Sequence, residues 1–485
     1  MPTIINKDVV IIGAGLTGLS TAHYLKKAGL SVAIIEKSSL IGGVMQTVHE
    51  GGFIFESGPN TGVLSNPEVA ELFIDLEAHC TLETANPEAK KRLILKSGKW
   101  EALPSGLMEA IKTPLFTFGD KLRILVEPFR RKGQDPFESI ADLVKRRLGK
   151  SYLNYAVDPF ISGIYAGDPS KLVTKYALPK LYLLEQNYGS FIKGGIKKSF
   201  EPKDPRLKMA TREVFSAKGG FGALTSALGK SVGHENICLN AQHTQVNHSD
   251  NQYIATVSLD GAEVEYRSKY LITTVDSTHL ATLLPFITAS QLANITNLEY
   301  ASVVQVALGF NEWKGCNINA FGGLVPTVEK RQILGVLFPS SFFNHRAPQN
   351  GALLSVFLGG MKRPDIFHLS DSEIQDLVFK ELQELMQLPE VKPNVIRIFR
   401  YQRAIPQYGK STKERLEAIA EIECQHQKLY IAGGLRDGIG MADRVKQAKS
   451  IADEIIALTR WDLKLWAAKR YINAAISPTL FVKVR

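Results

Sequence analysis

The amino-acid sequence predicts an α/β protein, and three observations support this class. Residues 8–12 (DVVII) are a short apolar run that predicts a buried strand, and the glycine-rich turn 13–18 (GAGLTG) follows at once. Apolar residues then recur at helical spacing over 19–28. A second apolar run, 31–35 (SVAII), ends in Glu36. This order of elements predicts a Rossmann-like, dinucleotide-binding fold.

Each residue type in the turn has a physical reason. Gly13 would make the turn, Gly15 would let the backbone approach a pyrophosphate, and Gly18 would let helix and strand pack closely. Glu36 stands 18 residues after Gly18, where a carboxylate can accept hydrogen bonds from ribose hydroxyls. The doublet Gly42-Gly43 predicts a second close approach to a flat, phosphate-linked group, with a simple turn as the alternative.

The chain returns to this site near its C-terminus. Residues 428–434 (KLYIAGG) predict a strand that runs into glycines, and 436–441 (RDGIGM) open a helix with apolar residues at Val445, Ile451 and Ile455. A helix N-terminus carries positive partial charge, so it would favour a bound group that gains negative charge.

Composition limits the possible classes of protein. At 485 residues the chain is long enough for about two to four folding units, and its 45% hydrophobic and 22% charged residues are those of a globular protein. The four cysteines are far apart and no histidine pair has ligand spacing, so we expect free thiols and no metal site. Met1 opens directly onto a strand-like run, which predicts a cytoplasmic protein, peripheral on the inner face of a membrane if its basic segments bind lipid.

Basic charge is concentrated in two segments. The formal net charge is +10; residues 88–150 hold 15 Lys or Arg against 8 acids, and residues 459–485 hold 6 against 1. Both segments interleave this charge with large apolar residues, which favours an anionic membrane surface over nucleic acid. A solvated basic face is the alternative.

Two stretches of the middle region have distinctive patterns. Residues 135–138 (DPFE) predict a helix start, followed by an apolar stripe through Phe137, Ile140, Val144 and Leu148 that is typical of core. Residues 155–172 (YAVDPFISGIYAGDPSKL) contain two prolines and two glycines, which predict neither a regular helix nor a regular strand. We interpret this stretch as the wall of a binding site.

That stretch also carries the most specific resemblance. It is very similar to a segment of the oxygen-dependent protoporphyrinogen oxidases, a branch of the FAD-containing amine oxidase and phytoene desaturase superfamily. The resemblance continues in FESGPNTG (55–62), KRLILKSGKWEALP (91–104), FGGLVP (321–326) and LFPSSFFNHRAP (337–348), and KGGF (218–221) looks like the superfamily's second nucleotide-side segment. It covers about residues 8–458 and stops before the tail.

The resemblance implies the cofactor and the reaction. FAD would accept a hydride at flavin N5 from a bridging carbon of protoporphyrinogen IX while a pyrrole NH loses a proton, three times in all, and dioxygen would reoxidise the flavin to give hydrogen peroxide. No general base is assigned.

The resemblance also implies site residues. Arg92 would pair with a propionate, Gly167 would approach the substrate through its backbone, and Leu324, Leu337 and Phe343 would sandwich its rings. A surface arginine, core leucines and Phe342 in place of Phe343 are the alternatives. The residues predicted to bind FAD are Gly13, Ala14, Gly15, Leu16, Thr17, Gly18, Glu36, Lys37, Gly42, Gly43, Gly58, Pro59, Asn60, Val246, Gly433, Ile439, Gly440 and Met441.

The implied architecture has three domains and a tail. They are a discontinuous Rossmann-like FAD domain of the glutathione reductase and amine oxidase type (1–85, 212–270 and 425–458), a mixed-sheet substrate domain (86–105, 196–211 and 271–424), a helical membrane-binding domain (106–195) and a tail of unknown role (459–485). Apolar residues at helical spacing in the tail suggest an interfacial helix or docking onto the protein's own core.

Other functions remain open at this stage. They are a coproporphyrinogen III oxidase, whose substrate has four propionates, another flavin amine oxidase or desaturase, and an FAD-free binding module of the Rab GDP-dissociation type. The expected partners are the porphyrinogen, dioxygen and an anionic membrane surface, with no nucleic acid. Ferrochelatase as the downstream acceptor, and a monomer or a homodimer, are left open.

Overall fold

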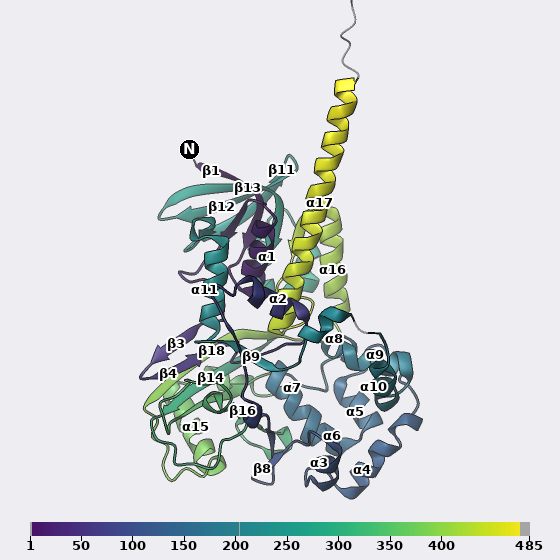
Figure 1. The fold of residues 1–485 in the computed structure, drawn as a ribbon, viewed down its shortest axis with the longest axis vertical. Coiled ribbons are helices and arrows are strands. Elements are labelled where there is room, and N and C mark those ends of the chain that lie inside the picture. The colour runs from purple at the N-terminus through teal and green to yellow at the C-terminus, as the bar shows by residue number, and fades with distance from the viewer. Residues whose placement is uncertain (1, 203, 476–485) are drawn as a thin grey trace, which may run out of the picture.

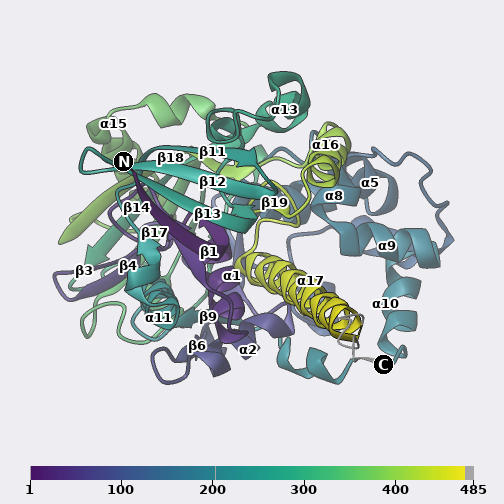
Figure 2. The same ribbon diagram turned by 90° about the horizontal axis from the view of Figure 1, so that it is seen from above.

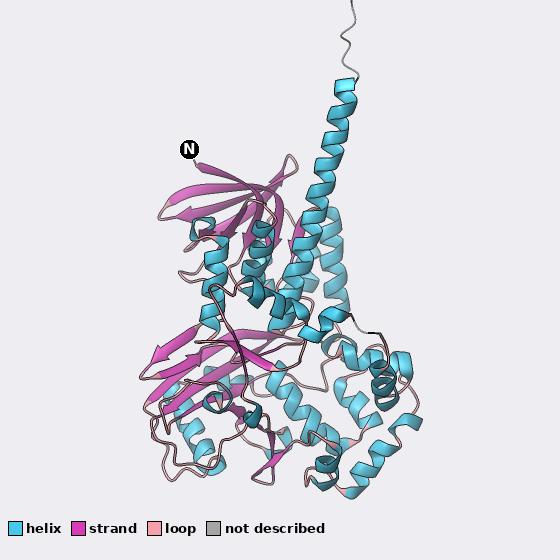
Figure 3. Ribbon diagram, viewed as in Figure 1, coloured by secondary structure: helices cyan, strands magenta, loops and turns pink. Residues whose placement is uncertain are grey.

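The computed structural model of the protein describes residues 2–202 and 204–475, with side chains described except at 107 and 461–475. Two large sheets lie one above the other along the long axis, and a group of helices lies beside the lower sheet (Figures 1 and 3). Strands and helices mix in both parts, so the predicted α/β class is confirmed.

The upper sheet is the predicted Rossmann-like unit. Its strand order is β10-β2-β1-β13-β12-β11, and β19 pairs with β13. The strands are β1 (Thr3–Ile12), β2 (Val32–Ile35), β10 (Ile237–Cys238), β11 (Gln242–Ser249), β12 (Gln252–Leu259), β13 (Ala262–Thr273) and β19 (Leu429–Ile431). Because β1, β2, β10, β13 and β19 are parallel, their carboxyl ends meet at one edge.

Helices cover both faces of this sheet. One core cluster joins the odd-numbered residues of β1 to helices α1 (Leu16–Lys27), α11 (Phe221–Val232) and α17 (Met441–Ala475). A second cluster joins its even-numbered residues to α12 (Leu280–Leu283), α13 (Ala289–Thr296) and α16 (Thr412–Gln425). Seen from above, α17 is viewed nearly end on, beside α1 (Figure 2). Apolar residues on both faces explain the continuous runs in the sequence.

The lower sheet is mixed, as predicted. Its order is β18-β14-β17-β16-β15-β7-β8, and only the β15–β7 pair is parallel. Helix α15 (Asp371–Leu385) packs on one face through an apolar cluster. The strands are β7 (Arg92–Lys96), β8 (Lys99–Ala102), β14 (Tyr300–Phe310), β15 (Gly322–Leu324), β16 (Ile333–Leu337), β17 (Ala352–Gly359) and β18 (Val395–Pro406).

Small elements connect the two sheets. They are the hairpin β3 (Thr47–Glu50) and β4 (Phe53–Glu56), the three-stranded set β5 (Gly62–Val63), β9 (Val214–Ala217) and β6 (Leu82–Thr84), and the helices α2 (Pro67–Asp75) and α14 (Pro339–Phe342).

The helical group consists of short helices between residues 107 and 199. They are α3 (Leu107–Lys112), α4 (Phe118–Leu125), α5 (Ile140–Arg147), α6 (Lys150–Tyr152), a π-helix (Leu153–Val157), α7 (Asp158–Tyr165), α8 (Thr174–Ala177), α9 (Pro179–Tyr188) and α10 (Phe191–Ser199). Over the described residues, no helix combines the length and the apolar character needed to cross a bilayer.

Two local predictions in this group are wrong. The stretch 155–172 is largely helical, because Pro159 stands at the start of α7, where its missing N–H costs little, and the wide π-turn before it accommodates the ring. Residues 135–138 form a turn instead of a helix start; α5 begins at Ile140, where Ser139 caps the Asp142 N–H. The stripe after it does pack as core, through Ile140 and Val144.

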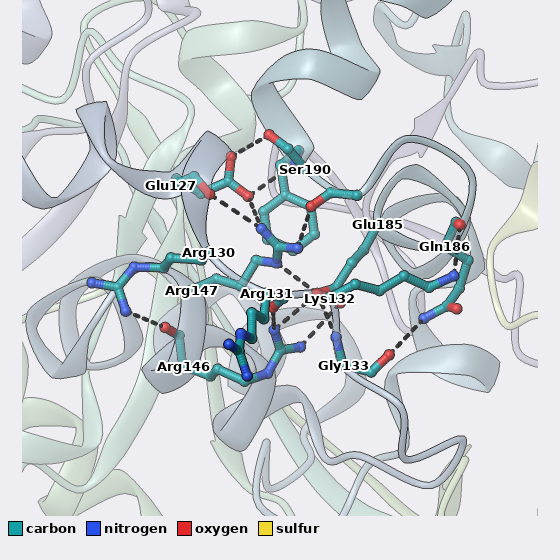
Figure 4. A network of polar contacts seen from close by, with 12 residues as sticks. Glu127, Arg130, Arg131, Lys132, Gly133, Arg146, Arg147, Glu185, Gln186 and Ser190 are labelled. Atoms are coloured by element: carbon teal, nitrogen blue, oxygen red, sulfur yellow. Dashed lines mark hydrogen bonds and ion pairs between the residues drawn. The ribbon is translucent and has the colours of Figure 1, made fainter.

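A buried ionic network ties the helical group together (Figure 4). Arg147, fully buried, donates to Glu127 and Glu185, while Glu127 accepts from the Ser190 hydroxyl and from the Phe191 N–H at the start of α10. Arg146 bridges Glu185 to a further carboxylate. Because removing one member would leave a buried charge unpaired, the network holds α5, α9 and α10 in fixed relation.

Helix α17 continues beyond the predicted FAD domain. It begins at Met441 and its 35 residues end at Ala475, and its C-terminal end projects past the upper sheet, at the end of the molecule opposite α3 and α4 (Figure 1). The predicted docking of 459–475 onto the protein's own core does not agree with this course. The predicted domain boundaries themselves remain a proposal, as do the roles of the tail side chains from 461 onward, which lie outside the described side chains.

Candidate active site

The predicted nucleotide-binding segments meet at the carboxyl edge of the upper sheet. The glycine turn follows β1, Glu36 follows β2, Thr274 follows β13 and Gly433 follows β19. Backbone hydrogen bonds close this edge: Gly13 N donates to Ile35 O at 2.8 Å, and Thr274 N donates to Ile12 O at 2.9 Å. In open parallel sheets, ligands bind in a crevice at this edge.

The three turn glycines have the three environments that the motif requires. Gly13 has φ +107°, and a Cβ there would lie 2.4 Å from Thr274 Oγ1. A Cβ at Gly18 would lie 2.0 Å from Gly13 O, so helix and strand touch only because Gly18 has no side chain. Around Gly15 no heavy atom lies within 4 Å of the Cβ position, which leaves the space open for a phosphate.

Glu36 lies directly beside this turn. Its Oε2 accepts from Ala14 N at 2.7 Å and its Oε1 from Ser38 N at 2.9 Å, and the side chain is nearly buried. These two bonds fix the carboxylate while leaving further acceptor sites, as a ribose-binding carboxylate requires. Lys37, next in the chain, is exposed.

The glycine doublet packs on the same turn. Gly42 N donates to Ala14 O at 2.7 Å, and a Cβ at Gly43 would lie 3.5 Å from Gly15 Cα. Both residues have positive φ, which a side chain would strain. The doublet therefore has a packing function beyond that of a simple turn.

Residues 56–60 link this edge to the lower sheet. Ser355 donates to Asn60 Oδ1 at 2.7 Å, Tyr401 OH to Ser57 O at 2.8 Å, and Gln305 Nε2 to Glu56 O at 2.7 Å. Gly58 and Pro59 are half-buried within the same segment. The predicted nucleotide-binding residues 58–60 thus lie between the two sheets.

The C-terminal loop closes the site from the other side. A Cβ at Gly433 would lie 3.0 Å from Thr274 O, and a Cβ at Gly62 would lie 2.9 Å from Met441 Cε. Ile439 packs against the apolar cluster that contains Tyr165 of α7. The start of α17 therefore lies near both the glycine edge and α7.

One predicted residue lies elsewhere. Val246 is fully buried in the second core cluster of the upper sheet, because its position in β11 directs its side chain to the covered face. The segment that runs beside Glu36 is Asn240–Ala241, where Ala241 N donates to Glu36 O at 3.0 Å. The structure does not bring the Val246 side chain to the glycine edge.

Three of the predicted substrate residues share one face of the lower sheet. In the register of β7, β15 and β16, Arg92 is aligned with Gly322 and Leu337. Two residues further along β7, Ile94 is aligned with Leu324 and Gly335. Because residues two apart in a strand face the same side, Arg92, Leu324 and Leu337 lie together. Ser355 and Gln305 lie on this face too, and their side chains donate hydrogen bonds to the segment 56–60.

The same register adds a residue that the sequence analysis missed. Phe357 pairs with Gly335 on one side and Gln305 on the other, so it lies on the Arg92 face, and its ring is half-buried. Phe343, the predicted sandwiching residue, is 4% exposed and packs with Phe342 in a small cluster under Arg346. Because Leu337 and Phe321 pack against that cluster, the predicted role of Phe343 stays a prediction, and Phe357 is a further candidate for contact with a ligand on this face.

Arg92 has a guanidinium available for a ligand. It is exposed, its Cζ lies 5.7 Å from the centre of the Phe321 ring, and no hydrogen bond or ion pair within residues 2–202 and 204–475 engages it. A guanidinium that packs on an aromatic ring and has no carboxylate partner can form a bidentate ion pair with the carboxylate of a ligand.

Helix α7 forms a wall beside this face. A Cβ at Gly163 would lie 2.6 Å from Leu324 Cδ2, and the neighbouring Phe160 and Ile164 are 42% and 44% exposed. Gly167, the predicted backbone contact, is instead buried, where a Cβ would lie 2.7 Å from Gln407 Oε1. Gly163 is therefore a second candidate for the close approach, the role of Gly167 stays a prediction, and the interpretation of 155–172 as a wall agrees with this arrangement.

An ion pair fastens the start of α7 to the sheet. Lys362 pairs with Asp158 and donates to Thr327 Oγ1 at 2.7 Å, and Asp158 Oδ2 accepts from Thr327 N at 2.8 Å. Asp158, the first residue of α7, is thus bonded to the segments that follow β15 and β17. These bonds fix the distance between α7 and Leu324.

Comparison with known proteins identifies the family. The family model of flavin-containing amine oxidoreductases matches residues 16–456, which is most of the chain. The chain belongs to this family. It is an FAD-dependent oxidoreductase, and the glycine edge described above is the predicted FAD site.

Individual relatives narrow the comparison. Protoporphyrinogen oxidase 2 of Arabidopsis thaliana is 28% identical, with 93% of this chain and 94% of the relative covered. Coproporphyrinogen III oxidase of Bacillus subtilis (strain 168) is 26% identical, with 93% and 98% covered. A crystal structure from Exiguobacterium sp. 255-15, provisionally named a protoporphyrinogen oxidase, has the same fold, with a TM-score of 0.77 at 23% identity over 93% of this chain and 99% of that one.

The described residues fit FAD. The open space over Gly15, the Glu36 carboxylate and the Gly42-Gly43 doublet suit an ADP moiety, and the 58–60 and 433–441 segments continue the site toward α7 and the lower sheet. FAD would supply the hydride acceptor there, and the chain would bind and orient it. Which individual residues touch FAD remains a prediction.

Proposed function

We propose that this flavoprotein is a protoporphyrinogen IX oxidase that produces protoporphyrin IX and uses dioxygen as the electron acceptor. The observation that carries the proposal is the lower-sheet face, where an uncompensated Arg92 stands beside an apolar surface of Leu324, Leu337 and Phe357. A flexible apolar macrocycle with propionates needs this combination. The names of the relatives support it.

The chain's own residues would bind and orient the macrocycle. Arg92 would pair with one propionate, the leucines and Phe357 would contact the pyrroles, and Gly163 would let α7 approach without a side chain. Bound FAD would supply the hydride acceptor. Loss of three hydrides and three pyrrole protons from the substrate would release six electrons, which three molecules of dioxygen would accept as hydrogen peroxide.

One experiment tests this proposal directly. The purified, FAD-loaded chain is incubated in air with protoporphyrinogen IX, and porphyrin fluorescence and hydrogen peroxide are followed together. We expect about three peroxides per porphyrin, because two electrons reduce each dioxygen. Porphyrin formation without peroxide would overturn the choice of acceptor, and absence of porphyrin would overturn the choice of substrate.

A second substrate has one observation in its favour. Lys96 lies on the same face of β7 as Arg92, four residues on, which is about 13 Å along a strand. It donates to Pro114 O and Leu115 O, and in the described part of the chain no carboxylate pairs with it. Two separated cations would suit a macrocycle with carboxylates on opposite edges, so coproporphyrinogen III belongs in the same assay.

We also propose that the helical group binds the surface of an anionic membrane. Apolar side chains on α4 and α10 are exposed and lie among basic residues. Lys193 of α10 lies over the ring of Phe129, which belongs to the short 3₁₀ turn Glu127–Phe129 after α4, so this turn joins the surfaces of the two helices. The network of Figure 4 holds this surface rigid. The exposed apolar residues are Met108, Ile111, Phe118, Leu122, Leu125, Val126, Phe129, Ile192, Ile196 and Phe200.

The helical group does not share this surface with the C-terminal helix. The end of α17 lies at the opposite end of the long axis from α3 and α4, so one flat bilayer would not meet both (Figure 1). The two basic segments of the sequence therefore need separate explanations, and the membrane proposal is confined to the helical group.

A further inference from the structure

An arginine stands in the first turn of α17, where a cation is electrostatically unfavourable. The backbone N–H groups at a helix N-terminus already carry positive partial charge, so acidic residues are the stabilising choice there. Asp443 follows that rule, since its Oδ2 accepts from Gly440 N at 3.2 Å. Arg444, the next residue, does not, and its position calls for a compensating interaction.

The compensation comes from the loop that precedes the helix. Arg444 Nη2 donates to Arg436 O and to Gly438 O, both at 2.7 Å, and Nη1 donates to Gly433 O. The guanidinium of Arg444 therefore donates hydrogen bonds to three backbone carbonyls of the segment 433–440. Its Nε is buried and has no hydrogen-bond partner among the described residues.

Gln447 closes the same loop one turn further on. Its Oε1 accepts from Gly433 N at 2.9 Å, and its Nε2 donates to Asp437 Oδ2 at 2.7 Å. Gly438 N donates to Tyr408 OH at 3.1 Å, which adds a tie to the lower sheet. Because Gly433, Asp437 and Gly438 have positive φ, the loop needs such ties to keep its course.

The charges around Arg444 define its electrostatic effect. Asp437 and Asp443 flank it on the loop and on the helix, while Arg436 pairs with both Glu423 and Asp437. Without Arg444, Asp443 would act on the loop uncompensated, and Asp437 would keep only the cation that it shares with Glu423. The segment 433–441 leads into the helix N-terminus that we expect to favour a bound group that gains negative charge, so this balance of charges would act on the flavin when it is reduced.

We propose that Arg444 is a positioning residue that shapes the 433–440 loop and, by opposing Asp437 and Asp443, raises the reduction potential of the bound flavin. The proposal rests on FAD binding at this site and not on the identity of the substrate. It assigns to Arg444 both a geometric role, through three carbonyls, and an electrostatic role, through its charge.

Different variants separate the two roles. Arg444→Met removes both the charge and the hydrogen bonds to the carbonyls. Arg444→Lys keeps the charge, but its compact ammonium group cannot donate to all three carbonyls as the planar guanidinium does. Asp437→Asn removes an opposing negative charge. Lys446→Met is the matched control, because Lys446 is an exposed cation of the same helix, two residues on.

The test is the midpoint potential of the bound flavin, measured by equilibration with a reference dye, together with the FAD content of each purified variant. We expect Arg444→Met to shift the two-electron equilibrium at least tenfold toward oxidised flavin, which corresponds to about 30 mV. Arg444→Lys should keep the potential and bind FAD more weakly, Asp437→Asn should shift the potential upward, and Lys446→Met should change neither quantity.

Two results would overturn the proposal. An unchanged potential in FAD-loaded Arg444→Met would remove the electrostatic role, and normal FAD affinity in Arg444→Lys would remove the geometric role. If Arg444→Met does not retain FAD, the sign of the shift in Asp437→Asn still decides the electrostatic part. A wild-type chain that takes up no FAD would contradict the cofactor assignment instead.

Discussion

The glycine edge of the upper sheet and the Arg92 face of the lower sheet differ in what they are made of. The first is shaped mainly by backbone: positive-φ glycines, strand ends and main-chain donors over short stretches of sequence. The second is shaped by side chains that come from strands as far apart as β7 and β17. A ligand that approaches the backbone closely is excluded when a glycine gains a side chain. A site lined by side chains can lose one of them and still bind its ligand through the others.

The largest expected effect is at the backbone site. Gly15→Val should abolish FAD retention while leaving the fold intact, because no protein atom occupies the Cβ position and only the phosphate approach is blocked. The measurement is the flavin absorbance of the purified variant and its thermal midpoint. Gly195→Val is the matched control, since its Cβ position is also open. Full flavin occupancy in Gly15→Val would refute the nucleotide site.

The next effect concerns the link between the two regions. Burial raises the pKa of Glu56 from 4.5 to about 7, although Thr47 and the Phe221 N–H donate to it. Between these two pKa values, Glu56 has lost its proton in the unfolded chain but keeps it in the folded chain. The free energy of unfolding should therefore fall as pH rises from about 4.5 to 7 and stay constant above that. The loss is about 3 kcal/mol.

Thermal unfolding of the wild type and of Glu56→Gln over pH 4.5–8 checks this prediction. The variant cannot ionise, so its stability should show less decline over that range. Parallel pH profiles for the two proteins would mean that Glu56 is not the titrating group.

A smaller effect is expected at the side-chain site. Arg92→Ala should raise KM for protoporphyrinogen IX about 10- to 150-fold and leave bound flavin unchanged, because a charged hydrogen bond contributes about 1.5–3 kcal/mol. Lys91→Ala is the control, since the neighbouring residue of the chain lies outside the Arg92 face. Equal KM values for both variants would place the propionate elsewhere.

The smallest effect tests the helical group. Each lysine near an anionic surface contributes about 1 kcal/mol, so the chain should sediment with anionic liposomes at low salt and be released at high salt. Ile196→Ser with Phe200→Ser should weaken this binding several-fold, whereas a chain that ends at Leu458 should bind like the full chain. Loss of binding only in the truncated chain would instead assign it to the tail.

The same contrast explains how much the sequence could predict. The turn 13–18, Glu36 and the C-terminal glycines were found from the sequence because local spacing specifies a backbone site. Phe357 was missed as a candidate, because which side of a strand a residue faces follows from the register between distant strands. Gly163 was missed for a similar reason: Pro159 obscured the helical course of 158–165, and this course directs Gly163 toward Leu324.

The position of β19 has a consequence for how the protein acquires its cofactor. β19 pairs with the end of β13, and Leu271 and Leu429 are partners in that pairing. A ribosome therefore completes the lower sheet before it makes the last parallel strand and the loop that close the FAD site. Until then one side of β13 at residues 271–273 has no partner strand, so we expect FAD to bind only after residues 429–441 have been made. A chain interrupted before residue 429 should lack flavin and expose an aggregation-prone strand edge.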